Sequence, residues 1–151
     1  MAYTRTNWVS GETPLSAGNM NNIEDGIEEL NSKIGAISTT SKSTNTSVSS
    51  TSYATVCTLS LPAGVYLLTG HVRWASIPAG RLSMSVGTGA QPGSEKDGVQ
   101  AHYSDTAASR NLGMQTSAVV TLSATSNVYL SVYSDSNATV SHGILTALRL
   151  K

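Results

Sequence analysis

Several residue types are scarce in this sequence of 151 residues, and each scarcity excludes a class of protein. Only 12% of the residues are charged and the formal net charge is zero, whereas nucleic-acid-binding and polybasic membrane-surface proteins cluster Lys and Arg. No apolar run reaches about 18 residues, so we expect no insertion into a membrane. Residues 1–8, MAYTRTNW, lack the apolar stretch of a signal peptide, so we expect synthesis in a cytoplasm.

Cysteine and phenylalanine are scarce as well, with one Cys and no Phe. The single Cys57 cannot form an intrachain disulfide, and no Cys or His lies near it at a zinc-binding spacing. Its place in an alternating segment indicates a small buried side chain. Hydrophobic residues make up 39% of the sequence, which leaves little apolar surface to bury. We therefore expect burial between subunits to add to the stability of the fold.

The stretch 20–37, MNNIEDGIEELNSKIGAI, has the spacing of a coiled coil. Apolar residues recur at alternating intervals of three and four, which are the a and d positions of a heptad. They are Met20, Ile23, Ile27, Leu30, Ile34 and Ile37. Ile at both a and d favours three or more helices over two. With Ser16 as its N-cap, the pattern predicts a trimeric coiled-coil helix over residues 16–37.

This helix is short for a device that holds three chains together. It spans about 27 Å, and each glycine within it costs about 1 kcal/mol relative to Ala. Glu29 and Lys33 supply one favourable i,i+4 ion pair. An amphipathic helix docked on its own domain is the alternative interpretation. We expect the homotrimer to begin at this helix and to be held by the domain that follows.

Residues 38–52, STTSKSTNTSVSSTS, are almost wholly Ser and Thr. They predict a linker, or an extended segment wrapped on its neighbours. From Tyr53 the period changes to two, and short strands are predicted at 53–61, 65–75, 82–86, 99–104, 115–122, 127–133 and 139–150. No second helix is predicted. The pattern indicates a mainly β protein with an antiparallel jelly-roll or β-sandwich head over residues 53–151.

The alternation also predicts which side chains share a face of each strand. The first strand groups Tyr53, Cys57, Leu59 and Leu61, the second groups Tyr66, Leu68, Val72 and Trp74, and the third groups Leu82, Met84 and Val86. In the last strand Ile144, Leu148 and Leu150 face one way.

Two parts of the sequence resemble known families. Thr6-Asn-Trp8 with the run from Thr13-Pro-Leu to Ile27 resembles a segment common in bacteriophage tail, fibre and baseplate proteins, where a Leu-Asn-x-Ile-Glu-x-Gly-Ile helix follows. Met20 stands where Leu is usual, and Gly18 where an acidic residue is usual. The run from Leu59 to Gly70, LSLPAGVYLLTG, resembles an early strand pair of C1q/TNF-like heads. The closing residues 145–150, LTALRL, are similar to the last strand of phage fibre heads.

The resemblance implies a homotrimeric virion fibre, tail-tip or receptor-binding protein. Its parts would be an attachment segment in residues 1–15, a stalk in residues 16–37 and a head in residues 53–151. The N-terminal residues would bind another virion protein, and the head would adhere to a glycan or protein of the host surface. The expected place is the virion, as a fibre, tail tip or capsid decoration.

Residues that could carry chemistry are present but are not arranged for it. His71, His102 and His142 have no second ligand at a metal-binding spacing, so we predict structural roles, with an ion on the threefold axis as the alternative. A Ser-His-Asp triad would lack its GxSxG elbow, and the Gly-rich residues 87–93 fit neither phosphate-binding pattern. Loop acids could bind calcium, but solvation is the simpler reading. We expect no cofactor, no metal and no enzymatic activity.

Binding by loops is the more promising function, because loops commonly carry recognition. Three predicted loops supply candidate contacts to a host receptor: Gln91, Glu95, Lys96, Asp97, Asp105, Arg110, Asn111, Asp135 and Asn137. Four aromatic residues could stack on sugars if exposed, although the first shares a face with core residues: Trp74, Tyr103, Tyr129 and Tyr133. The alternatives are a purely structural capsid, neck or baseplate component and an enzyme acting on envelope polysaccharide.

Overall fold

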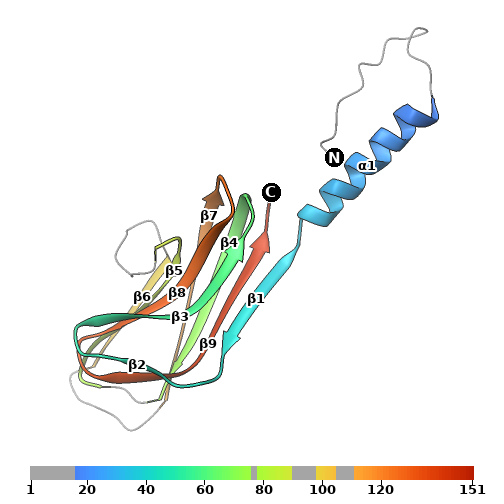
Figure 1. The fold of residues 1–151 in the computed structure, drawn as a ribbon. Coiled ribbons are helices and arrows are strands. Elements are labelled where there is room, and N and C mark those ends of the chain that lie inside the picture. The colour runs from blue at the N-terminus through green and yellow to red at the C-terminus, as the bar shows by residue number, and fades with distance from the viewer. Residues whose placement is uncertain (1–15, 76–77, 90–97, 105–110) are drawn as a thin grey trace. The chain divides into compact units, whose positions relative to one another are not determined.

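The computed structural model describes residues 16–75, 78–89, 98–104 and 111–151 (Figure 1). It divides into two compact units, one ending at Ala36 and one running from Ile37 to Lys151. Among the described residues, the first unit contains one helix and the second contains nine strands. No helix among the described residues is both long and apolar enough to cross a membrane.

The helix α1 (Ala17–Lys33) begins where the sequence predicts and ends earlier. Ser16 is its N-cap, and the Ser16 Oγ accepts a hydrogen bond from the backbone N–H of Asn19 at 3.2 Å. Lys33 and Glu29 form the expected ion pair. Helical hydrogen bonding stops at Ile34, whose backbone N–H donates to the carbonyl oxygen of Leu30, and Gly35 follows with a φ of 79°. The left-handed Gly35 closes the helix as glycine commonly does.

The placement of Ile37 at a helical d position is therefore wrong. Ile37 is the first residue of strand β1 (Ile37–Lys42) and pairs with Leu148. Ile34 stands at the C-cap rather than inside the helix. The heptad spacing continues past the helix because apolar residues recur in the sequence there, but the backbone has already become extended.

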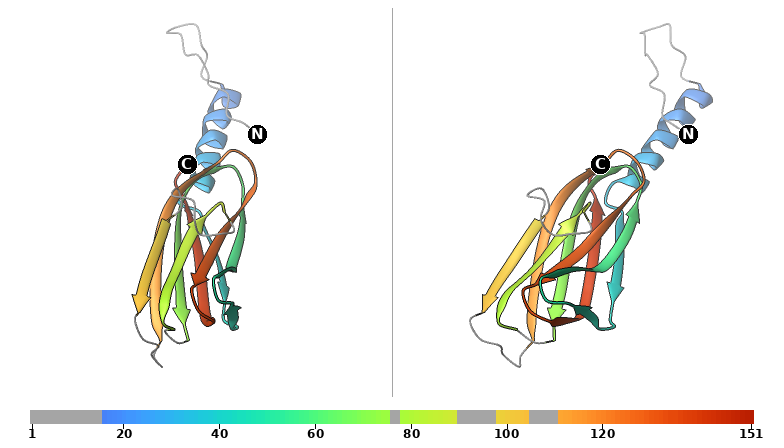
Figure 2. Two further views of the ribbon diagram at one scale, coloured as in Figure 1. Left: turned by 90° about the vertical axis from the view of Figure 1, so that its left-hand side faces the viewer. Right: turned by 60° about the vertical axis from the view of Figure 1, so that its left-hand side comes forward.

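The strands form two antiparallel sheets that face each other, and Figure 2 follows them from two further sides. One sheet has the order β1-β9-β4-β7, with β2 (Thr46–Val48) also paired to β9, and the other has the order β3-β8-β5-β6. The remaining strands are β3 (Ser52–Leu61), β4 (Gly64–Trp74), β5 (Gly80–Gly87), β6 (Gly98–Ser104), β7 (Leu112–Leu122), β8 (Ser126–Ser134) and β9 (Ala138–Arg149). This order is a jelly-roll sandwich, which confirms the predicted fold class.

Of the two interpretations of residues 38–52, the extended segment that lies on its neighbours is correct and the linker is wrong, because most of these residues join the sandwich. Residues 37–42 and 46–48 pair along β9, so the compact unit begins at Ile37 instead of Tyr53. These strands carry almost no hydrophobic alternation, because Ser and Thr occupy both faces. The open edge of β9 decides their structure, since its backbone N–H and C=O groups need partners.

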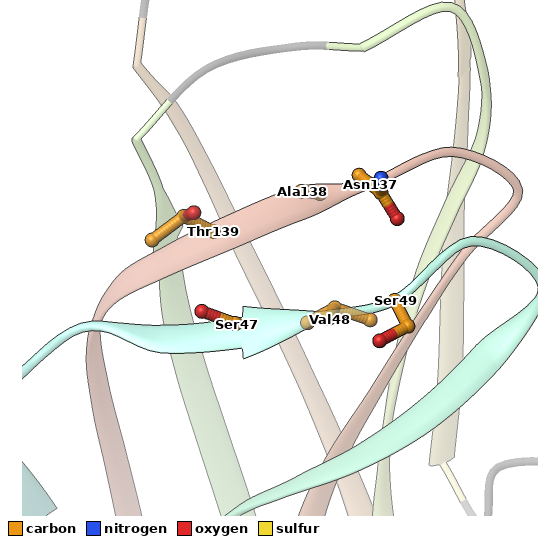
Figure 3. A pocket seen from close by; sticks show the side chains of 6 residues that line it. All are labelled: Ser47, Val48, Ser49, Asn137, Ala138 and Thr139. Carbon is orange, nitrogen blue, oxygen red and sulfur yellow. The ribbon is translucent and has the colours of Figure 1, made fainter.

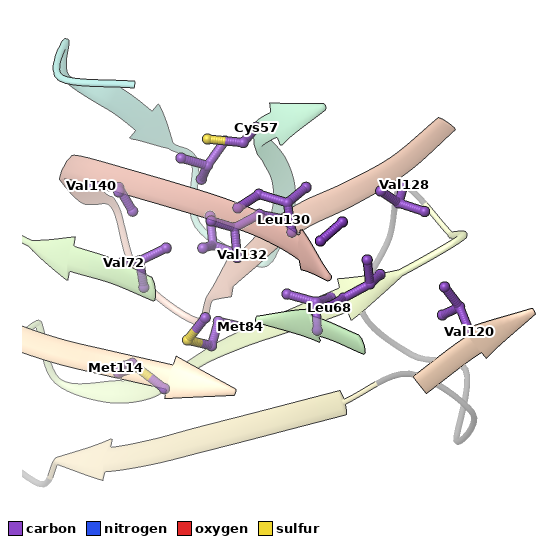
Figure 4. Packing of buried hydrophobic residues seen from close by; sticks show 14 of the residues in the cluster. Cys57, Leu68, Val72, Met84, Met114, Val120, Val128, Leu130, Val132 and Val140 are labelled. Atoms are coloured by element: carbon purple, nitrogen blue, oxygen red, sulfur yellow. The ribbon is translucent and has the colours of Figure 1, made fainter. Parts of the chain in front are cut away.

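The core lies between the two sheets, and Figure 4 shows its packing. The residues predicted to share faces of the second and third strands are buried there: Tyr66, Leu68, Val72, Trp74, Leu82, Met84 and Val86. The indole Nε1 of Trp74 donates to the Sδ atom of Met114 at 3.2 Å, which satisfies its only polar atom inside the core. Trp74 is therefore a core residue and not a stacking platform for sugars.

A β-bulge in β3 corrects the predicted face of Tyr53. Thr55 pairs with Ser131 and Cys57 pairs with Leu130, so Val56 is an extra residue on β3. An extra residue reverses the alternation upstream of it. Val56 and Cys57 are consequently both buried, whereas Tyr53 is 43% exposed. Cys57 is the small buried side chain that the sequence predicts, and burial raises the pKa of its thiol.

In β9 the residues Leu145 and Ala147 face the core. Ile144 and Leu148 do share a face, as predicted, and that face is the outer side of the sheet. Leu150 follows the strand and is exposed.

The sandwich has two ends, which we name the near end and the far end. At the near end β1 begins, β9 ends, and the turns β3–β4 and β7–β8 lie. At the far end lie the β2–β3 turn (residues 49–51), the residues before β5 (78–79), Asn111 before β7, and the β8–β9 turn (135–137). Figure 1 shows the far end below and the C-terminus at the near end.

Candidate recognition surface

Three of the nine predicted receptor contacts lie among the described residues, and all three are at the far end: Asn111, Asp135 and Asn137. The other six lie outside the described residues: Gln91, Glu95, Lys96, Asp97, Asp105 and Arg110. The strand ends that flank residues 91–97 are Gly87 and Gly98, which lie at the near end. The strand ends that flank Asp105 and Arg110 lie at the far end.

Asp135 ties the β8–β9 turn to the beginning of β5. Its Oδ2 accepts a hydrogen bond from the backbone N–H of Arg81 at 2.9 Å, and its own N–H donates to the carbonyl oxygen of Arg81 at 2.9 Å. Its carboxylate also accepts a hydrogen bond from the hydroxyl of Tyr133. The Arg81 N–H, and after it the Tyr133 hydroxyl, lower the pKa of Asp135, while the same hydroxyl-to-carboxylate bond raises the pKa of Tyr133.

An aromatic pair adjoins this carboxylate on the outer face of the β3-β8-β5-β6 sheet. Tyr53 and Tyr133 are register partners, and their ring centroids are 4.9 Å apart at an interplanar angle of 45°. The guanidinium carbon of Arg81 lies 5.8 Å from the Tyr133 ring centroid. The Arg81 Nε is buried and has no hydrogen-bond partner among the described residues. Tyr53 and Arg81 join this cluster although the sequence reasoning did not select them.

The sequence signals for this cluster were Asp135, selected as a loop contact, and Tyr133, selected as an aromatic residue that could stack on sugars. Tyr53 was placed in the core because nothing in the sequence marks the bulge at Val56. Tyr129 is half-buried on β8, and Tyr103 lies in β6, where its side chain is outside the described part of the chain.

Asn137 lies on the other side of the same turn, beside a shallow hollow of about 360 Å³ (Figure 3). The hollow is lined by residues of β2, β9 and their flanking turns: Ser47, Val48, Ser49, Asn137, Ala138 and Thr139. Asn137 Oδ1 accepts from the backbone N–H of Ser50 at 2.8 Å. The Ser50 hydroxyl donates to the carbonyl oxygen of Asp135 at 2.7 Å, so Ser50 joins the hollow to the aromatic cluster.

Asn111 holds the end of β4. In the amide orientation that satisfies both of its ends, Asn111 Nδ2 donates to the carbonyl oxygens of Ala75 and Trp74 at 3.2 and 3.3 Å. Its Oδ1 then accepts from Arg73 Nη2 at 2.6 Å. Each of the three described candidates is thus exposed and also bonded within its own chain.

The far end can therefore offer an aromatic ring, hydroxyl groups and amide groups to a ligand, held in place by backbone hydrogen bonds. Rings with hydroxyl and amide neighbours suit the apolar faces and hydroxyl groups of sugars, and they equally suit a polar protein surface. Ser47 and Thr139 are register partners and both line the hollow. We refer to the Tyr53–Tyr133–Arg81–Asp135 cluster with this hollow as the far-end surface.

The histidines lie in strands as predicted: His71 in β4, His102 in β6 and His142 in β9. Within the described ranges no three His, Cys, Asp or Glu side chains gather in a way that could hold a metal ion.

Comparisons with known proteins give a distant likeness only. No protein-family model matches the sequence, and no curated protein matches it. The chain is similar to a crystal structure of the infectious bursal disease virus VP2 subviral particle, with a TM-score of 0.48 and 10% identity. That alignment covers 76% of this chain and 33% of the other. A structure of the infectious bursal disease virus Gx strain has a TM-score of 0.47 and 12% identity, over 76% and 32% of the two chains. The chain thus spans about a third of these structures, and at such scores the likeness assigns no family.

Proposed function

We propose that this chain is the subunit of a homotrimeric virion fibre or tail-tip protein that adheres to a host cell surface. In this proposal α1 is the stalk, the sandwich is the head, and residues near the N-terminus bind another virion protein. The observation that carries the proposal is the uncovered a/d seam of α1, which leads within a few residues into a jelly-roll domain.

The seam supports a helix that needs partners. The helix has 17 residues and none of them is buried. Its seam residues in and next to the helix include Met20 at 46% exposure and Ile27 at 62% exposure. A helix of this length is marginal in water without partners, and a row of exposed aliphatic side chains is what a coiled coil covers.

The far-end surface is the proposed contact with the host. It lies on the end of the sandwich opposite to Ile37, where the chain enters the domain. The ligand class is a surface glycan or a polar protein surface. Three copies in one trimer raise weak single contacts to useful avidity. The proposal includes no catalytic step.

The first test measures the oligomeric state of the unmodified protein and its binding to host-surface ligands. Sedimentation is expected to show a trimer, and the trimer is expected to bind host envelopes or members of a glycan array. A Tyr53→Ala variant should weaken binding roughly two- to tenfold per site, as the loss of an aromatic contact does. The matched control is Tyr129→Ala, which removes an aromatic ring from the same sheet but away from the cluster. A trimer that binds no host-envelope preparation at high concentration would exclude the adhesive role.

A purely structural virion component is the second candidate. It is favoured by the intramolecular roles of Asn111, Asp135 and Asn137, which all bond to their own chain. Virions that lack the protein separate the two candidates: unchanged adsorption favours the structural role, and lost adsorption favours adhesion. Electron microscopy of virions with the protein labelled would show whether it lies on the capsid, the neck or the tail.

A further inference from the structure

The five strands of the β1-β9-β4-β7 sheet, counting β2, contain no Asp or Glu. Their formally charged residues are all positive: Lys42, Arg73 and Arg149. Two of the three histidines also lie in this sheet, His71 in β4 and His142 in β9. The whole chain has a formal net charge of zero, so the acids that balance this sheet lie elsewhere in the chain. A surface with one sign of charge attracts ligands of the opposite sign.

Three of these basic side chains share the outer face of the sheet, towards its far end. Val72 and Trp74 are fully buried, so the alternate residues His71 and Arg73 of the same strand point away from the core. His142 is the register partner of Arg73 on β9 and therefore shares this face. Directly opposite residues have Cβ atoms about 4.5–5.5 Å apart, and residues two apart on one strand are about 7 Å apart. The guanidinium group of Arg73 thus has an imidazole nearby on each of two strands.

The neighbouring strand β7 leaves open space beside Arg73, because the register partner of Arg73 on that strand is Gly113. Among the described residues, and apart from the chain neighbours of Gly113, the one atom within 4 Å of a Cβ placed there would be His71 Nε2, at 3.6 Å. Asn111 precedes β7 and lies within hydrogen-bond distance of Arg73. We name the space above Gly113, bordered by His71, Arg73 and Asn111, the basic niche.

The exposed Arg73 is held in place and still has unused hydrogen-bond donors. Its Nη2 donates to Asn111 Oδ1 at 2.6 Å, and Asn111 is itself held by the carbonyl oxygens of Ala75 and Trp74. The hydroxyl of Ser141 donates to the carbonyl oxygen of Arg73 at 3.1 Å, which fixes the backbone. Within the described part of the chain Arg73 forms no ion pair. Because a guanidinium group has several N–H groups, those not used by Asn111 remain for a ligand.

We infer that the basic niche binds an oxyanion, namely a phosphate or carboxylate group. The planar fork of the Arg73 guanidinium matches two oxygens of such a group, and the His71 imidazole adds a further donor when its Nε2 carries a proton. Gly113 leaves the room that the oxyanion needs, and His142 adds to the positive charge when it is protonated. This site is separate from the aromatic cluster at Tyr53, which lies on the other sheet, and it depends neither on a trimer nor on adhesion to a host.

An oxyanion fits the basic niche better than a metal ion does. Among the described residues no three His, Cys, Asp or Glu side chains gather to hold a metal, and the guanidinium of Arg73 would repel a cation. A carboxylate or phosphate oxygen instead accepts hydrogen bonds from cationic donors, and such charge-assisted bonds are stronger than neutral ones. No acid of the same sheet competes with the ligand for these donors.

The test follows the imidazole NMR signals of the full-length protein while inorganic phosphate, glucose 6-phosphate or glucuronate is added at constant pH and ionic strength. His102, in β6 of the other sheet, is the internal control. The His71 signals should shift and saturate with a dissociation constant on the order of 1 mM for at least one of the three anions, and the His142 signals should shift less. The His102 signals should not move. Glucose, which has the same sugar ring without the charge, should leave all three histidines unchanged.

Variants separate the charge of the niche from its shape. Arg73→Gln should raise the dissociation constant about tenfold or more, because it removes the guanidinium fork. Arg149→Gln removes the same charge from the near end of the same sheet and is the matched control. Gly113→Leu fills the niche without changing any charge and should weaken binding about tenfold or more as well. Circular dichroism checks that each variant folds.

The remaining results decide the inference either way. Saturation by the phosphates alone, or by glucuronate alone, supports the site and identifies its ligand class. Equal shifts of all three histidines, or shifts that do not saturate up to about 100 mM anion, would mean a general effect of salt and would overturn the site. Binding that survives both Arg73→Gln and Gly113→Leu would also overturn it. None of these results depends on the oligomeric state or on binding to a host envelope, so this inference and the proposed function can fail separately.

Discussion

The carboxylate of Asp135 and the backbone N–H of Arg81 are 2.9 Å apart and hydrogen-bonded, although the two residues are 54 positions apart in the sequence. The reciprocal bond from the Asp135 N–H to the Arg81 carbonyl oxygen closes the pair. The β8–β9 turn is thereby tied to the first residues of β5, and the aromatic ring of Tyr133 is held next to both. The far-end surface depends on this pair for its shape.

Asp135 should make the stability of the head depend on acid pH. Its pKa is lower in the folded chain than the ordinary value of about 3.9, so the unfolded chain binds more protons between the two values. The stabilisation is complete above the ordinary pKa and is lost as the pH falls through the folded pKa. Thermal unfolding of the native protein and of Asp135→Asn, followed from about pH 6 down to about pH 2, should show a difference in Tm that shrinks towards low pH. A difference that stays constant over this range would contradict the role of the carboxylate.

Gly70 should resist any larger side chain. A Cβ built there would meet Val86 of the opposite sheet and would lie 2.8 Å from Leu130 Cδ1, closer than carbon atoms approach each other. Gly70→Ala should therefore destabilise the fold by about 1–3 kcal/mol, as overpacking of a core does. At Gly113, on the outer side of β7, the nearest atom to such a Cβ is His71 Nε2 at 3.6 Å, an ordinary contact. Urea unfolding at one protein concentration should show Gly113→Ala close to the unmodified protein; an equal loss in both variants would argue against tight inter-sheet packing at Gly70.

The seam residues of α1 should contribute unequally to the association of the chains. Ile27 lies within α1, whereas Ile34 is at its C-cap. In a trimer Ile27→Asn should weaken association by about 1–3 kcal/mol per chain, because it buries an unpaired amide, and Ile34→Asn should have a smaller effect. Glu28→Gln, exposed and off the seam, is the control. Equilibrium sedimentation measures all three, and an Ile27→Asn variant that associates like the control would remove α1 from the interface.

Cys57 should report the opening of the core. It is buried between the sheets next to the bulge, and burial raises the pKa of its thiol, so little thiolate forms near neutral pH. Reaction with a thiol reagent at pH 8 should be about a hundredfold or more slower in the native protein than in urea, because labelling requires local opening. Labelling of the native protein at the denatured rate would mean that the bulged part of β3 does not stay closed.

Most of the head could be predicted from the sequence because its strands have one face in the core. The period-two pattern located all seven strands from β3 to β9 and selected buried residues such as Leu68, Trp74 and Met84 correctly. The helix was recognisable from its heptad spacing and its Ser16 cap. The end of the helix was misplaced because Ile37 continues the spacing, while Gly35 and the pairing of Ile37 with β9 end the helix.

Much less of the candidate site could be predicted from the sequence. Asp135 and Asn137 were selected as loop residues, but their partners Arg81 and Ser50 come from other turns. Tyr53 joined Tyr133 only because the bulge at Val56 turns it away from the core, and a bulge of this kind leaves no mark in residue type.

The sequence by itself determined the helix with its heptad spacing and the alternating strands, since both follow from local periodicity of apolar residues. Only the tertiary structure decided that residues 37–48 belong to the sandwich, because Ser and Thr carry no pattern and the open edge of β9 selects them. The tertiary structure also decided that four aliphatic residues lie side by side across one sheet: Ile37, Leu148, Leu67 and Val119. These residues come from four separated strands, and only inter-strand register, a long-range property, can align them.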